Sequence, residues 1–170
     1  AAMGKGNGIY VRQNRIPLLQ MLLCGAATAI GCLAVRYLGG DPYEKIHLYG
    51  MQEYLPPVKL LSCLWLLWHF LLGLAAGWVL FGQPKLPVAA YRGGMYFLLM
   101  LGAGYFFYPC FFTANARFLA FLLLAVALFF AVLCIADWFS LCAGAGVAIG
   151  LYAVWLVYLL ILVLNLLIRL

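Results

Sequence analysis

This chain carries its few charged residues between long uncharged stretches. Five stretches contain no Asp, Glu, Lys or Arg, and each is between 19 and 31 residues long. A helix needs about 20 mostly apolar residues to cross the roughly 30 Å hydrocarbon core of a bilayer, so every stretch is long enough to span it. The stretches are residues 16–35, 60–84, 93–116, 118–136 and 138–168.

Only helices and closed barrels cross a bilayer, because every backbone N–H and C=O has to be paired inside it. Barrel strands alternate polar and apolar residues in segments of about ten, whereas residues 118–124 include no polar residue. The sequence therefore predicts an all-α integral membrane protein, a five-transmembrane-helix bundle with a long loop between helices 1 and 2. The helices are expected at about residues 16–37, 58–82, 88–112, 115–136 and 142–168. Short connections predict that helices 2 to 5 pack as antiparallel neighbours in chain order.

Residues 16–170 are expected to form a single membrane domain. With 69% hydrophobic and 8% charged residues, the chain lies far from the soluble range of about 45–50% and 25%. Residues 1–15 are expected to be a Gly-rich tail, in part left over from cloning. A signal peptide is the alternative for the first stretch, but its 20 residues exceed the usual apolar core of about 7–15, which favours a retained helix.

The net charge of +6 indicates lipid rather than nucleic acid as a partner. No basic cluster with interleaved aromatic residues is present, so nucleic-acid binding is not expected. Nearly all Lys and Arg residues lie near predicted helix ends, where they can meet lipid headgroups. They divide five against five between the two sides of the membrane, so the positive-inside rule predicts no orientation.

Signatures of catalysis and metal binding are absent from the sequence. The six cysteines include no Cys-x-x-Cys pair, and His47 and His69 lie in different elements, whereas metal sites need clustered ligands. The motifs of hydrolases, zinc proteases, phosphate loops and dinucleotide folds are also missing. No ionisable pair is expected at membrane depth, which disfavours a proton relay or an ion-coupled pump. We therefore expect no catalytic residue, no metal and no required cofactor.

Residues 38–57 form the longest predicted loop and hold three of the four acidic residues. Pro56 and Pro57 stiffen its junction with the second helix, and Gly50 provides a flexible point within it. Loops of this length tend to be functional, and Tyr54 has an apolar ring to bury. We expect the loop to fold back over the bundle as a lid; a solvated connector is the alternative.

Aromatic residues are concentrated on particular helix faces. Spacings of four residues place Trp65, His69 and Gly73 on one face of the second helix, and Gly104 shares a face with Phe107 on the third. Large rings beside glycines favour a pocket for a flat hydrophobic ligand, although the same rings also occur as packing residues or interfacial belts. For His69, a hydrogen-bonded packing role competes with ligand binding.

The second predicted helix and the residues before it carry a spaced motif. Tyr54 is followed, after one residue, by Pro56 and Pro57. Trp65 comes eight residues after the second proline, and Gly73 comes eight residues after Trp65. This pattern resembles the signature of the translocator protein family, whose members are also called tryptophan-rich sensory proteins or peripheral benzodiazepine receptors.

Two further stretches extend the resemblance over most of residues 16–168. Residues 107–112 are similar to the family's Trp-Ser-Pro-x-Phe-Phe at the end of its third helix, and residues 152–155 are similar to its Pro-Tyr-x-x-Trp in the fifth. The chain departs from the family pattern at Gly104, where the family has Asn, and at His69, where it has an aromatic residue. The resemblance is therefore that of a divergent member.

The resemblance implies a membrane-embedded binding protein or sensor for a porphyrin, such as protoporphyrin IX or haem, or for a sterol-like or drug-like molecule. It also implies a homodimer in contact with lipid, in the bacterial cytoplasmic membrane or, for a eukaryotic chain, the mitochondrial outer membrane, and it allows a weak porphyrin-degrading activity. The implied pocket lies under the loop, with Gly50, Pro56 and Pro57 as lid and hinge. The implied ligand-binding residues are Tyr54, Trp65, His69, Gly104, Phe107, Phe111, Tyr152 and Trp155.

Two other functions stay open at this point. A small membrane transporter would show broken helices or repeated halves, and five spans do not divide into equal halves. A structural subunit of a larger membrane complex would use the same aromatic residues as an interface. Quenching of tryptophan emission by a porphyrin separates a binding protein from a scaffold.

Overall fold

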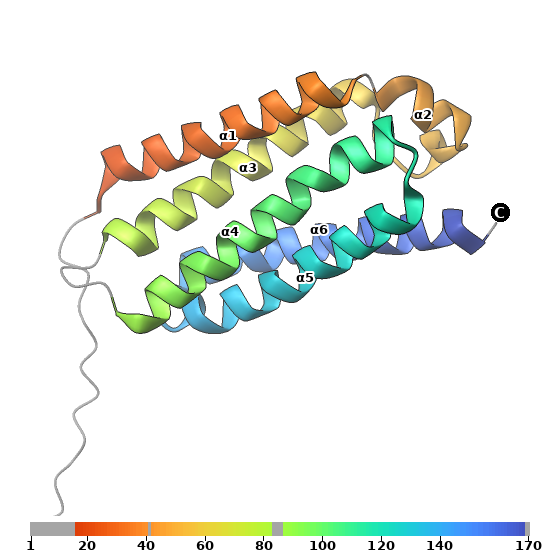
Figure 1. The fold of residues 1–170 in the computed structure, drawn as a ribbon. Helices are drawn as coiled ribbons and strands as arrows, with labels where there is room; N and C mark the ends of the chain where they lie inside the picture. Colours follow the sequence, from red (N-terminus) through yellow and green to blue (C-terminus); the bar gives the residue numbers. More distant parts are fainter. Residues whose placement is uncertain (1–15, 41, 83–86, 169–170) are drawn as a thin grey trace, which may run out of the picture.

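The structure of the protein, a computed structural model, describes residues 16–40, 42–82 and 87–168. All regular secondary structure in these ranges is helical, and five helices are long and apolar enough to cross a membrane (Figure 1). The elements are α1 (Leu18–Gly39), α2 (Pro42–Leu48), the 3₁₀ turn η1 (Met51–Glu53), α3 (Val58–Phe81), α4 (Val88–Tyr108), the π-helical turn η2 (Pro109–Thr113), α5 (Arg117–Phe139) and α6 (Ala143–Ile168). The chain is an all-α, multi-pass membrane protein.

The five predicted spans are confirmed, and they differ from the expected bounds mainly at two places. The fourth span was expected to end near residue 136, before a charged residue, but α5 continues through Asp137 to Phe139. It continues because the Asp137 carboxylate is paired with Arg92 of α4 and is therefore compatible with a helical position. The loop after the first span is also shorter than expected, since α1 extends to Gly39, and it contains α2 and η1.

The spanning helices are arranged around the bundle in the order α1, α3, α6, α5, α4 (Figure 1). The prediction that α3 and α4 are close neighbours is wrong, because these two helices touch over a small area only. Glycine residues explain the difference. Gly73 and Gly77 of α3 face α1, and a Cβ at Gly77 would lie 2.6 Å from the Cα of Met21. The hydroxyl of Thr28 also donates to the backbone oxygen of His69 at 2.7 Å, so α1 occupies this face of α3.

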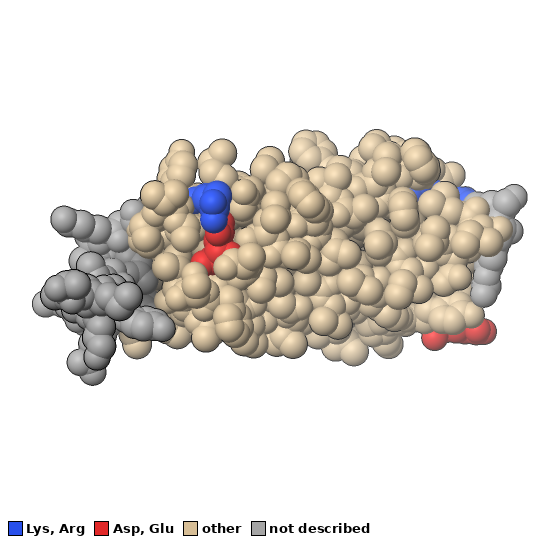
Figure 2. Space-filling model, turned by 90° about the horizontal axis from the view of Figure 1, so that it is seen from below, with Lys and Arg blue, Asp and Glu red and all other residues tan. Residues whose placement is uncertain are grey.

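Trp138 fills the interface between α4 and α5. Its side chain is completely buried, and its indole occupies the space that a Cβ at Gly93 would need. Beside it, Arg92 and Asp137 form a bidentate ion pair, with Nε–Oδ2 at 2.9 Å and Nη2–Oδ1 at 2.5 Å. Sequence reasoning missed this pair, which lies near the beginning of α4 and the end of α5 rather than at mid-membrane. Most of the bundle face in Figure 2 is uncharged.

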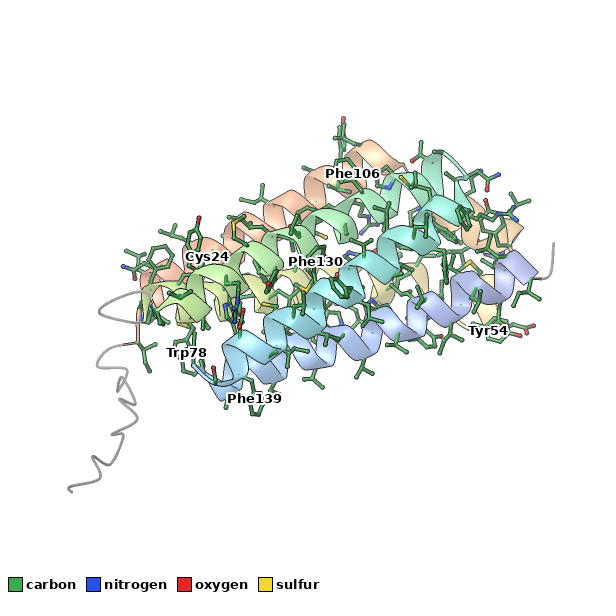
Figure 3. The ribbon with its side chains drawn as sticks, turned by 60° about the horizontal axis from the view of Figure 1, so that its bottom comes forward. Cys24, Tyr54, Trp78, Phe106, Phe130 and Phe139 are labelled. Carbon is green, nitrogen blue, oxygen red and sulfur yellow. The ribbon has the colours of Figure 1, made fainter. Side chains whose placement is uncertain are left out.

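The outer surface of the bundle is apolar and its interior is packed around small residues. Phe106 and Phe139 point away from the bundle (Figure 3) and are 67% and 55% exposed. Side chains of this kind match a hydrocarbon solvent rather than water. Inside, Ala120, Ala127 and Ala131 of α5 have no exposed surface. Small residues at these positions allow the backbone of α5 to approach its neighbours closely.

A cap formed by α2 and η1 covers the end of the bundle at which α6 also ends (Figure 1). The hydroxyl of Tyr49 donates to Asn115 Oδ1, and the guanidinium of Arg117 lies 4.4 Å above the Tyr49 ring centroid. On the α6 side, the hydroxyl of Tyr158 donates to the backbone oxygen of Tyr54. The segment is therefore folded onto the bundle and fastened to it, in contrast to a solvated connector.

Two glycines shape the entry into the cap and the turn within it. Gly40 and Gly50 have φ angles of 75° and 63°, a region that glycine enters without the steric cost of a Cβ. Pro57 has a φ of −48° and precedes the first residue of α3. A proline is tolerated there because its missing N–H would be unpaired in any case. The backbone thus fixes where the cap begins, turns and ends.

Candidate functional site

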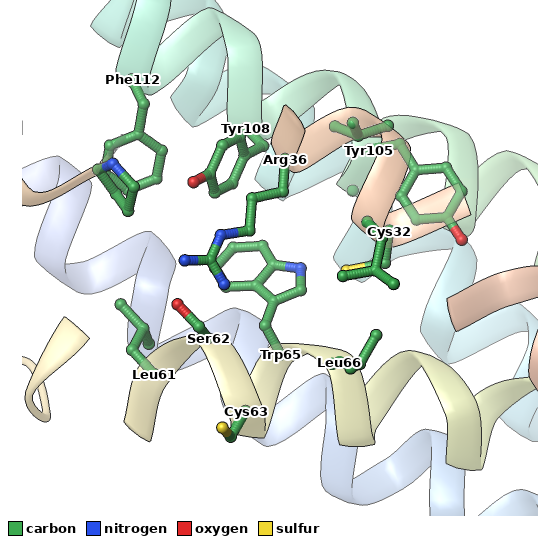
Figure 4. Close-up of a pocket in the computed structure, with 14 residues that line it drawn as sticks. Cys32, Arg36, Leu61, Ser62, Cys63, Trp65, Leu66, Tyr105, Tyr108 and Phe112 are labelled. Atoms are coloured by element: carbon green, nitrogen blue, oxygen red, sulfur yellow. The ribbon is translucent and has the colours of Figure 1, made fainter. Parts of the chain in front are cut away.

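A cavity lies between α1, α3 and α4, under the cap, and is called here the aromatic pocket. It encloses about 710 Å³, including its open mouth. Its lining residues are Cys32, Leu33, Val35 and Arg36 of α1, Pro42 of α2, Leu61, Ser62, Cys63, Trp65 and Leu66 of α3, Gly104, Tyr105 and Tyr108 of α4, and Phe112 of η2 (Figure 4).

Trp65 forms one wall of the aromatic pocket, and other aromatic rings pack against it. Its indole lies parallel to the ring of Phe107, with 6.0 Å between the centroids and 5° between the planes. The ring of Tyr108 meets it edge-on at 5.9 Å. Phe107 in turn stacks on Phe111 at 5.5 Å, and both phenylalanines are buried. Trp65 is therefore held in one orientation by a layer of aromatic residues behind it.

His69 lies beside this layer and does not line the pocket. Its side chain is 1% exposed, and its ring stacks on that of Tyr105 at 5.2 Å. Nδ1 lies 2.8 Å from the backbone oxygen of Trp65. A carbonyl oxygen only accepts, so Nδ1 carries the proton and Nε2 has a lone pair. Nε2 is buried and has no hydrogen-bond partner among the described residues.

Tyr105 closes the pocket at its end farther from the cap. Its hydroxyl donates to the backbone oxygen of Thr28 at 2.6 Å and so bridges α4 and α1. The bridge needs a small residue on α1, because a Cβ at Gly31 would lie 2.9 Å from the Tyr105 hydroxyl. Gly104, the neighbour of Tyr105, lines the pocket. A Cβ at Gly104 would come within 3.0 Å of the Tyr152 hydroxyl.

The structure separates three of the sequence-predicted site residues from the pocket. Tyr152 is buried between α3 and α6, with its ring edge-on to that of His69 at 6.1 Å. Trp155 stacks on Tyr158 of the same helix at 5.5 Å. Tyr54 lines a different cavity, of about 600 Å³, between η1 and α6. Neither Tyr152 nor Trp155 of α6 lines the pocket, although the Tyr152 hydroxyl lies behind the lining residue Gly104.

The predicted residues that remain divide into two groups. Trp65 and Gly104 line the aromatic pocket directly. Phe107, Phe111 and His69 form the layer of rings behind or beside Trp65. Among the predicted lid and hinge residues, Gly50 borders the cavity that contains Tyr54. Pro56 and Pro57 border an open cleft beside α2.

Sequence reasoning missed several lining residues, and some of them carried a usable signal. Tyr105, Tyr108 and Phe112 are spaced by three and four residues, which places them on one face of a helix. That face could have been recognised as a second aromatic wall. Cys32 and Arg36 carried no such signal, because their place in the pocket depends on how α1 packs against α3.

The mouth of the aromatic pocket faces the outer surface of the bundle. Two of its lining residues, Leu33 of α1 and Cys63 of α3, are exposed, Leu33 by 48%. Since the outer surface is apolar and faces lipid, a hydrophobic ligand can enter from the side of the bundle. Cys63 is a free thiol at this mouth.

No group of three or more His, Cys, Asp or Glu side chains able to hold a metal ion occurs among the residues that the structure describes. The six cysteines are free thiols. Comparisons with protein-family models, with curated proteins and with solved structures find no match to this chain. Its function therefore has to follow from the chemistry of the pocket and of the sequence motif around Trp65.

Proposed function

We propose that this protein is a membrane-embedded binding protein, acting as a sensor, for a flat hydrophobic ligand held in the aromatic pocket. The preferred ligand is a porphyrin, protoporphyrin IX or haem, and a sterol-like molecule is the second choice. The observation that carries the proposal is the position of Trp65, which lines the pocket while other rings hold it in place.

The chemistry of the pocket supports a planar hydrophobic ligand. Small-molecule sites are typically concave and apolar and carry few polar groups, and the lining of this pocket is of that kind. Arg36 and Ser62 are the main polar side chains at its wall, beside the hydroxyls of Tyr105 and Tyr108. Aromatic pairs contribute about 0.5–1.5 kcal/mol beyond the area that they bury. A porphyrin provides a large aromatic face for Trp65.

The layer of rings behind Trp65 supports a sensing role. Phe107 and Phe111 lead from Trp65 towards the cap, where Tyr49 meets Phe111 edge-on at 5.8 Å. A ligand that stacks on Trp65 orders this layer and, through Tyr49, the cap. The cap is then the segment that reports ligand binding at the membrane surface.

The resemblance to the translocator protein family supports the finer parts of the proposal. Trp65 occupies the position of the family's signature tryptophan. By the same resemblance the protein is a homodimer of the bacterial cytoplasmic membrane, or of the mitochondrial outer membrane if the chain is eukaryotic. The same resemblance allows a weak porphyrin-degrading activity, which the proposal does not require. Light scattering of the protein in mild detergent tests the dimer.

A porphyrin titration tests the proposed function. The protein in lipid nanodiscs is titrated with protoporphyrin IX while its tryptophan emission is recorded, and empty nanodiscs measure simple partitioning. We expect saturable quenching with one porphyrin per chain. A structural subunit that uses its aromatic residues as an interface would show only the linear signal of partitioning, and this result would overturn the proposal.

A further inference from the structure

A second cleft adjoins the aromatic pocket beside α2, and it is called here the basic cleft. It is open to the outside. The end of α1, the helix α2 and the first turn of α3 surround it. Three of its lining residues, Arg36, His47 and Lys59, have basic side chains. Among the described side chains that line it, none is acidic.

Arg36 belongs to both cavities and connects them. It lies in the last turn of α1 and lines the aromatic pocket as well as the basic cleft. Figure 4 shows its side chain extending over the pocket, with Ser62 and Trp65 on the facing helix α3. The guanidinium forms no hydrogen bond or ion pair with any other described residue. Arg36 is partly exposed, and its place in the last turn of α1 favours a cation, so the guanidinium is held at the junction and is available to an anion.

Lys59 lies at a position where a positive charge destabilises its own helix. It is the second residue of α3, and the positive end of the helix dipole disfavours a cation in the first turn. The helix begins without a side-chain cap, so its own dipole adds to the positive potential of the cleft. His47 stands on the opposite wall, on α2, against the ring of Tyr43 at 4.5 Å. The basic cleft therefore attracts anions.

We infer that the ligand of this protein is an anionic amphiphile whose flat apolar body occupies the aromatic pocket and whose acid groups bind Arg36 and Lys59 in the basic cleft. The inference rests on the proposed function and adds the class of ligand. Guanidinium and carboxylate groups form short, charge-assisted and often bidentate hydrogen bonds. An acid group at the junction of the two cavities gives Arg36 its partner. A neutral ligand such as a sterol leaves the basic cleft unused.

Paired porphyrins test the inference without changing the apolar body. Protoporphyrin IX carries two propionate groups, and its dimethyl ester is neutral. The affinity of each is measured from the porphyrin Soret band, with the full chain in nanodiscs of zwitterionic phosphatidylcholine. The variants are Arg36→Met, Lys59→Met and Arg36→Lys. Lys45→Met is the matched control, because it removes one positive charge from the neighbouring helix α2, and Lys45 lines neither cavity.

We expect Arg36→Met to weaken binding of the diacid by about tenfold or more, and Lys59→Met to weaken it by about threefold. Neither variant changes binding of the diester, and Lys45→Met changes neither ligand. Arg36→Lys recovers part of the affinity for the diacid, which shows that the loss is one of charge and not of folding. An equal effect of Arg36→Met on diacid and diester would overturn the inference while the proposed function stands. If neither porphyrin binds the wild type, the proposed function itself fails.

A second titration distinguishes whether the basic cleft binds a lipid phosphate or only the carboxylate of the ligand. Phosphatidylglycerol is added to the nanodiscs, and the titration with the diacid is repeated for the wild type and for Arg36→Met. Competition in the wild type that is lost in Arg36→Met assigns the basic cleft to a lipid phosphate as well as to a free carboxylate. Absence of competition assigns it to the carboxylate alone. Competition that persists unchanged in Arg36→Met places anion binding elsewhere and contradicts the inference.

Discussion

The indole of Trp65 lies parallel to the ring of Phe107, with 6.0 Å between the ring centroids and 5° between the planes. This contact joins α3 to α4, two helices that otherwise touch over a small area. The same stack continues to Phe111 and reaches Tyr49 of the cap. An uninterrupted series of rings therefore connects the wall of the aromatic pocket with the segment that covers the end of the bundle.

Replacement of Trp65 by Ala should weaken protoporphyrin IX binding by more than about 1 kcal/mol, because the variant loses the aromatic face of the pocket. Trp155→Ala should leave the affinity unchanged, since Trp155 stacks on Tyr158 and does not line the pocket. Trp78→Ala, in the half of α3 away from the cap, serves as a second control. Dissociation constants from porphyrin titrations provide the comparison. Equal losses in all three variants would indicate general destabilisation instead of a pocket.

His69 should act as a packing residue and not as an axial haem ligand. Its Nε2 is buried and finds no hydrogen-bond partner among the described residues, a situation that costs about 1–3 kcal/mol. His69→Phe removes this atom and keeps a ring on Tyr105, so the variant should unfold at the same or a higher temperature than the wild type. The Soret band of bound ferric haem should be the same in both proteins. A shifted Soret band in the variant would show that His69 coordinates the iron.

The cap should become more protected when the pocket is filled. Hydrogen exchange of the backbone amides in residues 42–57 should slow when protoporphyrin IX is bound, because ordering of a weakly held segment appears as protection. Tyr158→Phe removes the hydroxyl that donates to Tyr54, and exchange at the end of the cap should be faster in this variant. A lid is contradicted if exchange in residues 42–57 is the same with and without porphyrin.

Substitution of Gly93 by Ala should destabilise the interface between α4 and α5. The added Cβ would collide with the indole of Trp138, which is completely buried. Overpacking of this kind typically costs about 1–3 kcal/mol, so Gly93→Ala should lower the unfolding temperature. Gly102→Ala is the matched control on the same helix, because a Cβ at Gly102 meets nothing within 4 Å. The control should be neutral or slightly stabilising, since Ala favours a helix over Gly by about 0.8–1.0 kcal/mol.

The number of spans followed from the sequence because charge is so costly in lipid that its absence marks each helix. The end of α5 could not be predicted from the sequence. A charged residue such as Asp137 indicates a helix boundary unless its ion-pair partner, Arg92, is known. The order of the helices did not follow either. It depends on Gly73 and Gly77, which accept α1, and the sequence alone does not say which helix a glycine face will receive.

The lining of the candidate site could be predicted where the residues share one face of a single helix. Trp65, Phe107 and Gly104 were found from spacing within a helix, and the structure places all three at or behind one wall of the pocket. Cys32 and Arg36 could not be predicted, because both enter the site only through the packing of α1 on α3. Residues that become neighbours only through tertiary packing leave no periodic signal in the sequence.

The central claim is that the ligand binds in the cavity between α1, α3 and α4, and two adjacent leucines of α3 test it most directly. Leu66 lines the aromatic pocket, whereas Leu67 is 52% exposed on the outer surface. Protoporphyrin IX is titrated against the wild type, Leu66→Trp and Leu67→Trp in nanodiscs, and binding is followed at the porphyrin Soret band. We predict that Leu66→Trp fills the pocket and abolishes saturable binding, while Leu67→Trp binds like the wild type. Equal affinity in the two variants would contradict the claim.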